Sequence, residues 1–141
     1  MEIVEITAKD DRGYKRFFTA GLERHDDCFR ISPADEANDP FPTKGTPDSF
    51  TLAAVTDAGE LMYVASEYAG RGVGGALIEG IVRRAKNLPT IEQVNLTVLA
   101  GNERAKGLYF KYGFRVYGVE KNSVKSGGRY YDEELMAHFL I

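Results

Sequence analysis

The sequence predicts an α/β fold in a single domain over residues 1–141, with a central mixed sheet flanked by helices. Three observations predict it. Short strand patterns alternate with helical patterns, a glycine-rich segment joins a strand to a helix near mid-chain, and two final strands suggest an antiparallel hairpin. With 43% hydrophobic and 28% charged residues, the chain can bury one core of ordinary size.

The first half of the chain predicts a helix and three short strands. Residues Glu2–Thr7 and Ser49–Val55 follow strand patterns, and residues 25–49, which follow the helix, are irregular. That helix is expected at Asp10–Arg24, where two aspartates can cap its start. A tight turn then leads to a further strand at Leu61–Val64.

The second half predicts two helices and three strands. Helices are expected at Val73–Lys86 and Asn102–Tyr112, the second of them ended by a glycine. A strand at Glu92–Leu99 lies between them, and Phe114–Glu120 with Arg129–Leu140 form the closing hairpin. In the helix at Val73–Lys86, the side chains that we expect to face the core are Val73, Ala76, Leu77, Ile81 and Ala85.

Charge is divided unevenly along a chain of net charge −3. Residues 1–69 hold 7 basic and 14 acidic side chains, whereas residues 70–141 hold 11 basic and 7 acidic ones. Two oppositely charged ligands or two solvated faces would both explain this. Without a basic stripe, nucleic acid is not an expected partner. Neither a leader-like N-terminus nor an apolar run near the roughly 20 residues of a membrane span is present, so we expect a cytoplasmic protein without membrane contact.

The segment EYAGRGVGGALIEG, residues 67–80, places four glycines directly before a helical pattern. Glycine lets the backbone approach a ligand closely, and the first N–H groups of a helix have no helical partner. The helix dipole favours negative charge at the same point, so the segment predicts an anion site, usually for phosphate. A tight turn that binds nothing is the alternative.

Two nucleotide-binding patterns fit this segment poorly. Gly70, Gly72 and Gly75 satisfy the dinucleotide pattern G-x-G-x-x-G. That pattern expects an acidic residue at the end of the next strand, but Glu92 opens its strand instead. The Walker pattern fails because no Lys-Ser/Thr pair follows the loop.

A second segment, NERAKGLYFKYGF at residues 102–114, decides between these possibilities. Together the two segments resemble the GNAT superfamily of acyl-CoA-dependent N-acyltransferases. The family's first signature, Gln/Arg-x-x-Gly-x-Gly/Ala, is matched by AGRGVG except at Ala69. The second, Asn-x-x-Ala-x-x-Leu-Tyr-x-x-x-Gly-Phe, is matched at every position, by Asn102, Ala105, Leu108, Tyr109, Gly113 and Phe114.

The resemblance implies a GNAT-like fold, acetyl-CoA as cosubstrate without a metal, and acetyl transfer to a primary amine by direct attack in a ternary complex. Backbone around Tyr63–Ala65 would pair with the pantetheine arm, the amide of Val64 would face the thioester oxygen, and the glycine loop would hold the pyrophosphate. Asn102 would bond an amide of the arm, and Tyr109 would be the general acid. The cofactor-binding candidates are Tyr63, Val64, Ala69, Gly70, Arg71, Gly72, Val73, Gly74, Gly75 and Asn102.

Two departures from the family pattern leave alternatives open. With alanine at position 69, either Arg71 supplies the missing charge or CoA binds more weakly. Only TDAG separates the strands at 49–55 and 61–64, so the sheet is predicted to be one strand short. A homodimer would cover the resulting edge. The alternative function is a catalytically inactive CoA-binding domain that acts as a sensor or interaction module.

Each candidate residue also has a purely structural explanation. Asn102 is a good helix N-cap, and Tyr109 can be a core aromatic residue. No general base is assigned: Glu60, Glu67 and a water chain are candidates, whereas His138 is expected to pack or to lie at the surface rather than to react. The acceptor, a small-molecule or peptide amine, is not identified by the sequence, and the acidic N-terminal half is expected to attract it.

Overall fold

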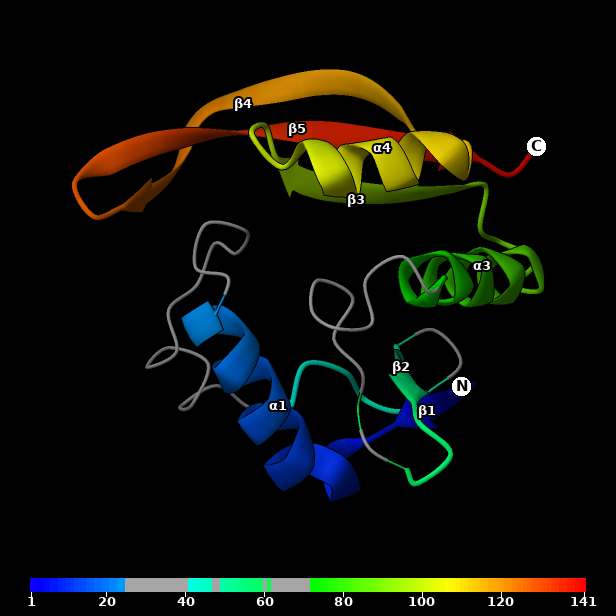
Figure 1. Cartoon of the computed structure of the whole chain (residues 1–141). Coiled ribbons are helices and arrows are strands. Elements are labelled where there is room, and N and C mark those ends of the chain that lie inside the picture. The colour runs from blue at the N-terminus through cyan, green and yellow to red at the C-terminus, as the bar shows by residue number, and fades with distance from the viewer. Residues whose placement is uncertain (25–40, 47–48, 60, 62–71) are drawn as a thin grey trace. The chain divides into compact units, whose positions relative to one another are not determined.

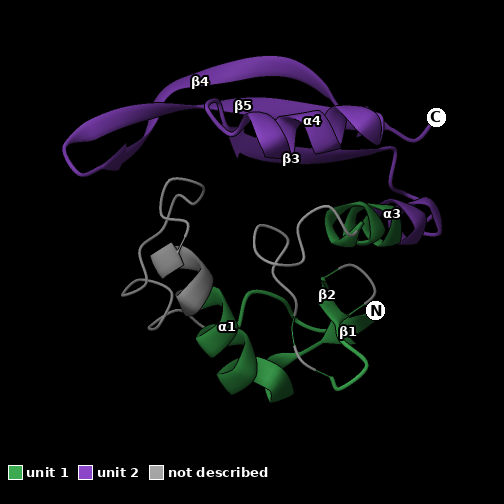
Figure 2. Cartoon of the chain, viewed as in Figure 1, with its two compact units in different colours: residues 1–81 green, residues 82–141 purple. Residues whose placement is uncertain are grey.

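In the computed structural model the described residues form two compact units, residues 1–81 and 82–141 (Figures 1 and 2). The residues that the structure describes are 1–24, 41–46, 49–59, 61 and 72–141. The boundary between the units lies within helix α3, Val73–Lys86. This helix has the bounds predicted from the sequence.

The first unit contains an antiparallel pair of strands, β1 (Glu2–Ile6) and β2 (Thr51–Val55). After β1, a 3₁₀ turn, η1 (Ala8–Asp10), leads directly into helix α1 (Asp11–Arg24). These elements follow the predicted order. Leu61 makes a single antiparallel bridge with Val55, but residues 62–64 of the strand predicted there lie outside the described residues. The expectation that the sheet is one strand short therefore stays a prediction.

The first helical turn is capped by Thr7 rather than by the aspartates. Thr7 Oγ1 accepts a hydrogen bond from the N–H of Lys9 at 3.4 Å, and the N–H of Thr7 donates to Asp10 Oδ2 at 2.9 Å. This reciprocal capping box satisfies N–H groups that have no helical partner. The prediction that aspartate caps the helix was therefore wrong. Thr7 is the N-cap, and Asp10, three residues later, accepts the N–H of Thr7.

Helix α3 approaches the strands of the first unit at a glycine. A Cβ at Gly80 would lie 3.0 Å from Leu52 Cδ1 and 3.7 Å from Ile3 Cγ2, so the missing side chain permits the close approach. Ile81 was predicted to face the core but is 39% exposed. Successive helical residues point about 100° apart, so with Gly80 against the strands the next side chain points aside.

The second unit is a three-stranded antiparallel sheet with one helix. Its strands β3 (Gln93–Leu99), β5 (Arg129–Phe139) and β4 (Arg115–Ser126) lie in that order, and helix α4 (Glu103–Lys111) connects β3 to β4. The predicted hairpin is confirmed, with its turn at Gly127 and Gly128. The α/β class predicted from the sequence is therefore confirmed, and every strand pairing described is antiparallel.

Strand β4 continues six residues beyond its predicted end because a side chain bridges an irregularity. Asn122 has a positive φ of 52°, and the strand register shifts between Glu120 and Val124. Asp132 Oδ1 accepts the N–H of Asn122 at 2.8 Å, and Oδ2 accepts from Lys121 Nζ at 3.1 Å. The Asn122 N–H, and then Lys121, lower the pKa of Asp132 below its ordinary value of 3.8.

Asp132→Asn is expected to reduce thermal stability near neutral pH and to leave it almost unchanged in acid. A carboxyl whose pKa is lowered by folding stabilises the protein above its unfolded pKa, and this contribution is lost as the pH falls through the folded value. The melting temperatures of the two proteins should therefore differ between about pH 5 and 7, and the difference should begin to shrink only as the pH falls below about 4, toward the folded pKa of Asp132. A constant difference across this range would show that the charge is irrelevant.

None of the described helices is long and apolar enough to cross a membrane.

Candidate active site

The described part of the glycine-rich segment forms the start of α3. The N–H of Ala76 donates to the carbonyl of Gly72 at 2.9 Å, which is the first bond of the helix. Gly72 has a φ of +80°, a conformation that favours glycine. The N–H groups of Val73, Gly74 and Gly75 therefore lie in the first turn, where the helix offers them no acceptor.

The electrostatics of α3 favour an anion at this end. Its first turn has no acidic side chain, whereas its last turn carries Arg83, Arg84 and Lys86, which compensate the opposite end of the dipole. The side chain of Val73 is 2% exposed and packs with Ala54 in the core. Val73 can therefore offer a ligand its backbone N–H but not its side chain, and the turn can seat a phosphate-like group.

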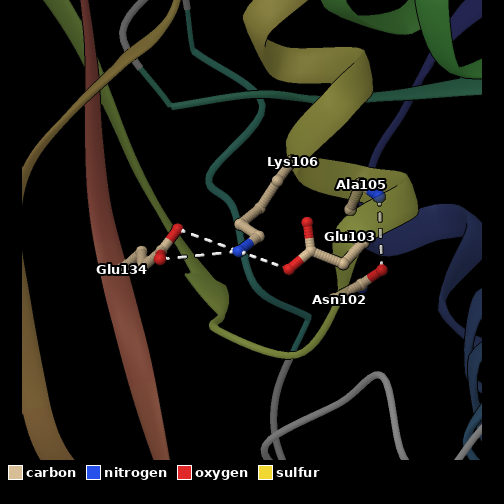
Figure 3. Close-up of polar contacts among 5 residues, drawn as sticks. All are labelled: Asn102, Glu103, Ala105, Lys106 and Glu134. Atoms are coloured by element: carbon tan, nitrogen blue, oxygen red, sulfur yellow. Dashed lines mark hydrogen bonds and ion pairs between the residues drawn. The ribbon is translucent and has the colours of Figure 1, made fainter.

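Asn102 is the N-cap of α4, as predicted. Its Oδ1 accepts the N–H of Ala105 at 3.2 Å (Figure 3). Its carbonyl accepts the N–H of Lys106 at 3.1 Å. Because a backbone N–H can only donate, the accepting side-chain atom must be the oxygen. The two N–H donors of Nδ2 are not used in capping, and no hydrogen bond from them occurs within the described part of the chain. Asn102 can therefore donate to a ligand carbonyl while it caps the helix.

Tyr109 lies on the same side of α4 as Asn102, because seven residues turn a helix by about 700°, nearly two full turns. The N–H of Phe114 donates to the Tyr109 carbonyl at 3.0 Å, and the N–H of Gly113 donates to the Phe110 carbonyl at 3.1 Å. Gly113 has a φ of +92°. These bonds form a Schellman motif, whose usual apolar contact is the one between the Tyr109 and Phe114 rings, 5.9 Å apart.

His138, on β5, completes this helix end. Its Nδ1 donates to the Tyr112 carbonyl at 2.8 Å, since a carbonyl can only accept. Its ring meets the edge of Phe114 at a centroid distance of 5.4 Å and would lie 2.9 Å from a Cβ at Gly113. His138 therefore packs, as expected, and it holds the ring that contacts Tyr109.

Burial raises the pKa of Tyr109 above its ordinary value of 10.0. The phenol is therefore protonated at neutral pH and can donate a proton or a hydrogen bond. Within the described residues its hydroxyl has no hydrogen-bond partner. Such a group suits a proton donor to a leaving thiolate better than it suits a general base.

The described candidates fall in two groups. Gly72, Val73, Gly74 and Gly75 belong to the first unit, whereas Asn102 and Tyr109 share one face of α4 in the second. The candidates outside the described residues are Tyr63, Val64, Ala69, Gly70 and Arg71, together with the base candidates Glu60 and Glu67. Sequence reasoning missed Lys106, although its place four residues after Asn102 and three before Tyr109 puts it on the same helix face.

Comparison with solved structures identifies the fold of this protein. A structure of a GCN5-related N-acetyltransferase from Kribbella flavida superimposes with a TM-score of 0.78 at 21% identity, covering 99% of this chain and 97% of that one. A GNAT superfamily phosphinothricin acetyltransferase from Sinorhizobium meliloti, in complex with AcCoA, gives 0.77 at 18% identity, covering 99% and 88%. The fold is therefore that of the GCN5-related N-acetyltransferases.

Sequence comparison identifies the family. The sequence model of the protein family described as acetyltransferase (GNAT) domain matches residues 44–116, just over half of the chain. The L-amino acid N-acetyltransferase AaaT of Escherichia coli strain K12 is 34% identical over 74 residues. This match covers 52% of the chain and 46% of that protein, so it spans slightly less than half of the relative. The chain belongs to the GNAT acetyltransferase family, which confirms the family and fold predicted from the two signatures.

Proposed function

We propose that this protein transfers the acetyl group of acetyl-CoA to a primary amine by direct attack in a ternary complex. The observation that carries the proposal is the family match at residues 44–116, because it includes both the anion-favouring start of α3 and the helix that bears Asn102 and Tyr109. The AcCoA complex of the Sinorhizobium meliloti acetyltransferase supports acetyl-CoA as the cosubstrate.

In this proposal the backbone binds most of the cosubstrate. The N–H groups of Gly72–Gly75 hold the pyrophosphate, because the start of a helix favours an anion. Gly70 and the cationic side chain of Arg71 assist them in this proposal. Asn102 Nδ2 donates to a carbonyl of the pantetheine arm. The backbone at Tyr63–Ala65 pairs with the same arm.

The chemistry requires three proton transfers around one acyl transfer. The neutral amine attacks the thioester carbon, a C–N bond forms, and the oxyanion is stabilised by the N–H of Val64. Collapse of the intermediate breaks the C–S bond, and Tyr109 gives its proton to the departing thiolate. The amine nitrogen releases a proton to solvent or to a base, and the phenolate of Tyr109 is reprotonated. Atoms and charge then balance.

The E. coli relative is named for L-amino acids, so the α-amino group of a free amino acid is the first acceptor class to test. The purified protein would be mixed with acetyl-CoA and a panel of amino acids, amines and peptides, and thiol release would be measured together with calorimetry of CoA binding. Amine-dependent thiol release supports the proposal. CoA binding without release would instead support the inactive CoA-binding domain, and no binding at millimolar CoA would contradict both.

Asn102→Asp should separate the two roles of this residue. Aspartate is as good an N-cap as asparagine and its charge suits the helix dipole, so the melting temperature should be unchanged or higher. The variant lacks the Nδ2 donor, however, so the Kd for CoA should rise about 10-fold. Asn102→Ala is the control and should lose both stability and affinity. An unchanged Kd in the aspartate variant would leave Asn102 with its capping role alone.

A further inference from the structure

Lys106 is a buried lysine that the proposed chemistry does not use. It is 8% exposed, although lysine is rarely buried unless it is paired. Its Nζ lies 2.9 Å from Glu103 Oε1 and 3.4 Å from each carboxylate oxygen of Glu134 (Figure 3). The hydrogen bond that Nζ donates to Glu103 is the largest influence on the pKa of Lys106 and raises it, burial lowers it, and Glu134 raises it again. The net pKa lies above its ordinary value, so the ammonium is retained at neutral pH.

These contacts join the first turn of α4 to strand β5. Glu103 is the first residue of the helix, directly after Asn102, and Glu134 lies on β5 opposite Val98. Within α4 itself, the N–H of Lys106 donates to the carbonyl of Asn102, so the residue bearing the ammonium is one helical turn from the N-cap. The contacts of Lys106 thus fix the start of α4 relative to the sheet. Asn102, which we expect to contact acetyl-CoA, lies at this start.

Stability alone gives no clear reason for a charge at this position. A buried ion pair gains little over an apolar side chain of similar volume, because desolvation offsets the attraction. Glu134 retains partial exposure, with 21% of its side chain accessible, so water can solvate it if the ammonium is removed. A methionine at position 106 would fill similar space without directing the helix toward a carboxylate.

We propose that Lys106 is a positioning residue of the acetyl-CoA site, which acts through Asn102 and through the placement of α4 on β5. The proposal rests on the proposed function, because it assumes that Asn102 meets the cosubstrate. It assigns to Lys106 no contact with substrate. Its consequence is that loss of the ammonium impairs the binding of acetyl-CoA more than it impairs folding.

The test compares Lys106→Met, Lys106→Arg and Glu134→Gln with the unmodified protein. Lys106→Met should raise the KM for acetyl-CoA and the Kd for CoA about 3- to 10-fold, the value of one misaligned hydrogen bond, with a smaller change in kcat. Arginine should restore most of the affinity, since it keeps the ion pair with Glu134. Lys111→Met, which removes an exposed lysine of the last turn of the same helix, is the matched control and should change neither constant.

Two further measurements distinguish a positioning role of Lys106 from a general effect on folding, and neither requires turnover. Amide hydrogen exchange at Ala105, whose N–H is held by Asn102, should be faster in Lys106→Met and normal in Lys111→Met. Glu134→Gln, which keeps a neutral acceptor, should shift the Kd in the same direction by less. A lower melting temperature with unchanged KM, Kd and exchange would overturn the positioning role. Failure of the unmodified protein to bind CoA would instead reject the proposed function itself.

Discussion

Tyr109→Phe is expected to lower kcat about 100-fold or more and to leave the Kd for CoA nearly unchanged. The substitution removes the hydroxyl and keeps the ring that packs 5.9 Å from Phe114, so the helix end should stay intact. Without the phenol, the thiolate must leave unprotonated or take its proton from water. Steady-state thiol release, calorimetry of CoA binding and a thermal melt on the same preparations would separate chemistry from binding and folding.

Tyr112→Phe is the matched control, because Tyr112 caps the same helix through its backbone and has no proposed chemical role. Its kcat should equal that of the unmodified protein. Burial raises the pKa of Tyr109 above 10.0, so this phenol is protonated near neutral pH and its ionisation should cause no loss of activity there. An unaltered kcat in Tyr109→Phe would remove Tyr109 from the mechanism and leave it as a core aromatic residue.

Gly113→Ala is expected to destabilise the protein by roughly 2 to 5 kcal/mol. The left-handed backbone costs an L-residue about 1–2 kcal/mol, and overpacking a filled site costs about 1–3 kcal/mol more. Both costs apply at Gly113, where φ is +92° and a Cβ would lie 2.9 Å from the His138 ring. Denaturant unfolding would measure the change, and kcat should fall as well because the Schellman motif orients Tyr109.

Gly107→Ala supplies a control of opposite sign. Gly107 is an exposed residue of α4 with nothing within 4 Å of a Cβ, so alanine should stabilise the helix by about 0.5–1 kcal/mol. The double variant Gly113→Ala, His138→Ala would relieve the clash but not the positive φ. It should therefore show less than additive destabilisation. Equal and small effects of alanine at Gly107 and Gly113 would refute this account of the helix end.

Local signals explain why so much of the α3 and α4 regions could be predicted. The bounds of α3 follow from glycines before it and Pro89 after it, and α4 follows from Asn102 as cap and Gly113 as terminator. Each of these residues acts on its own neighbours in the chain, so no tertiary information is needed.

The missed features depend on partners distant in sequence. The extension of β4 requires Asp132 of the next strand, and the burial of Lys106 requires Glu134, 28 residues away. The exposure of Ile81 follows from the approach of Gly80 to Leu52, which helical periodicity does not specify. Among the candidate site residues, the sequence predicted the helix ends that carry them, whereas their contact with acetyl-CoA stays a prediction.

The Schellman motif at the end of α4 has a consequence for how relatives of this protein are interpreted. Gly113 and Phe114 close the helix and support a ring, and neither needs to touch a reacting atom. A homologue that kept this glycine–phenylalanine pair but carried another residue in place of Tyr109 would still match most of the signature and would keep the same helix end. It would lack the hydroxyl that we propose as the proton donor. A signature match therefore reports a shared fold, and in our proposal turnover depends on that one hydroxyl.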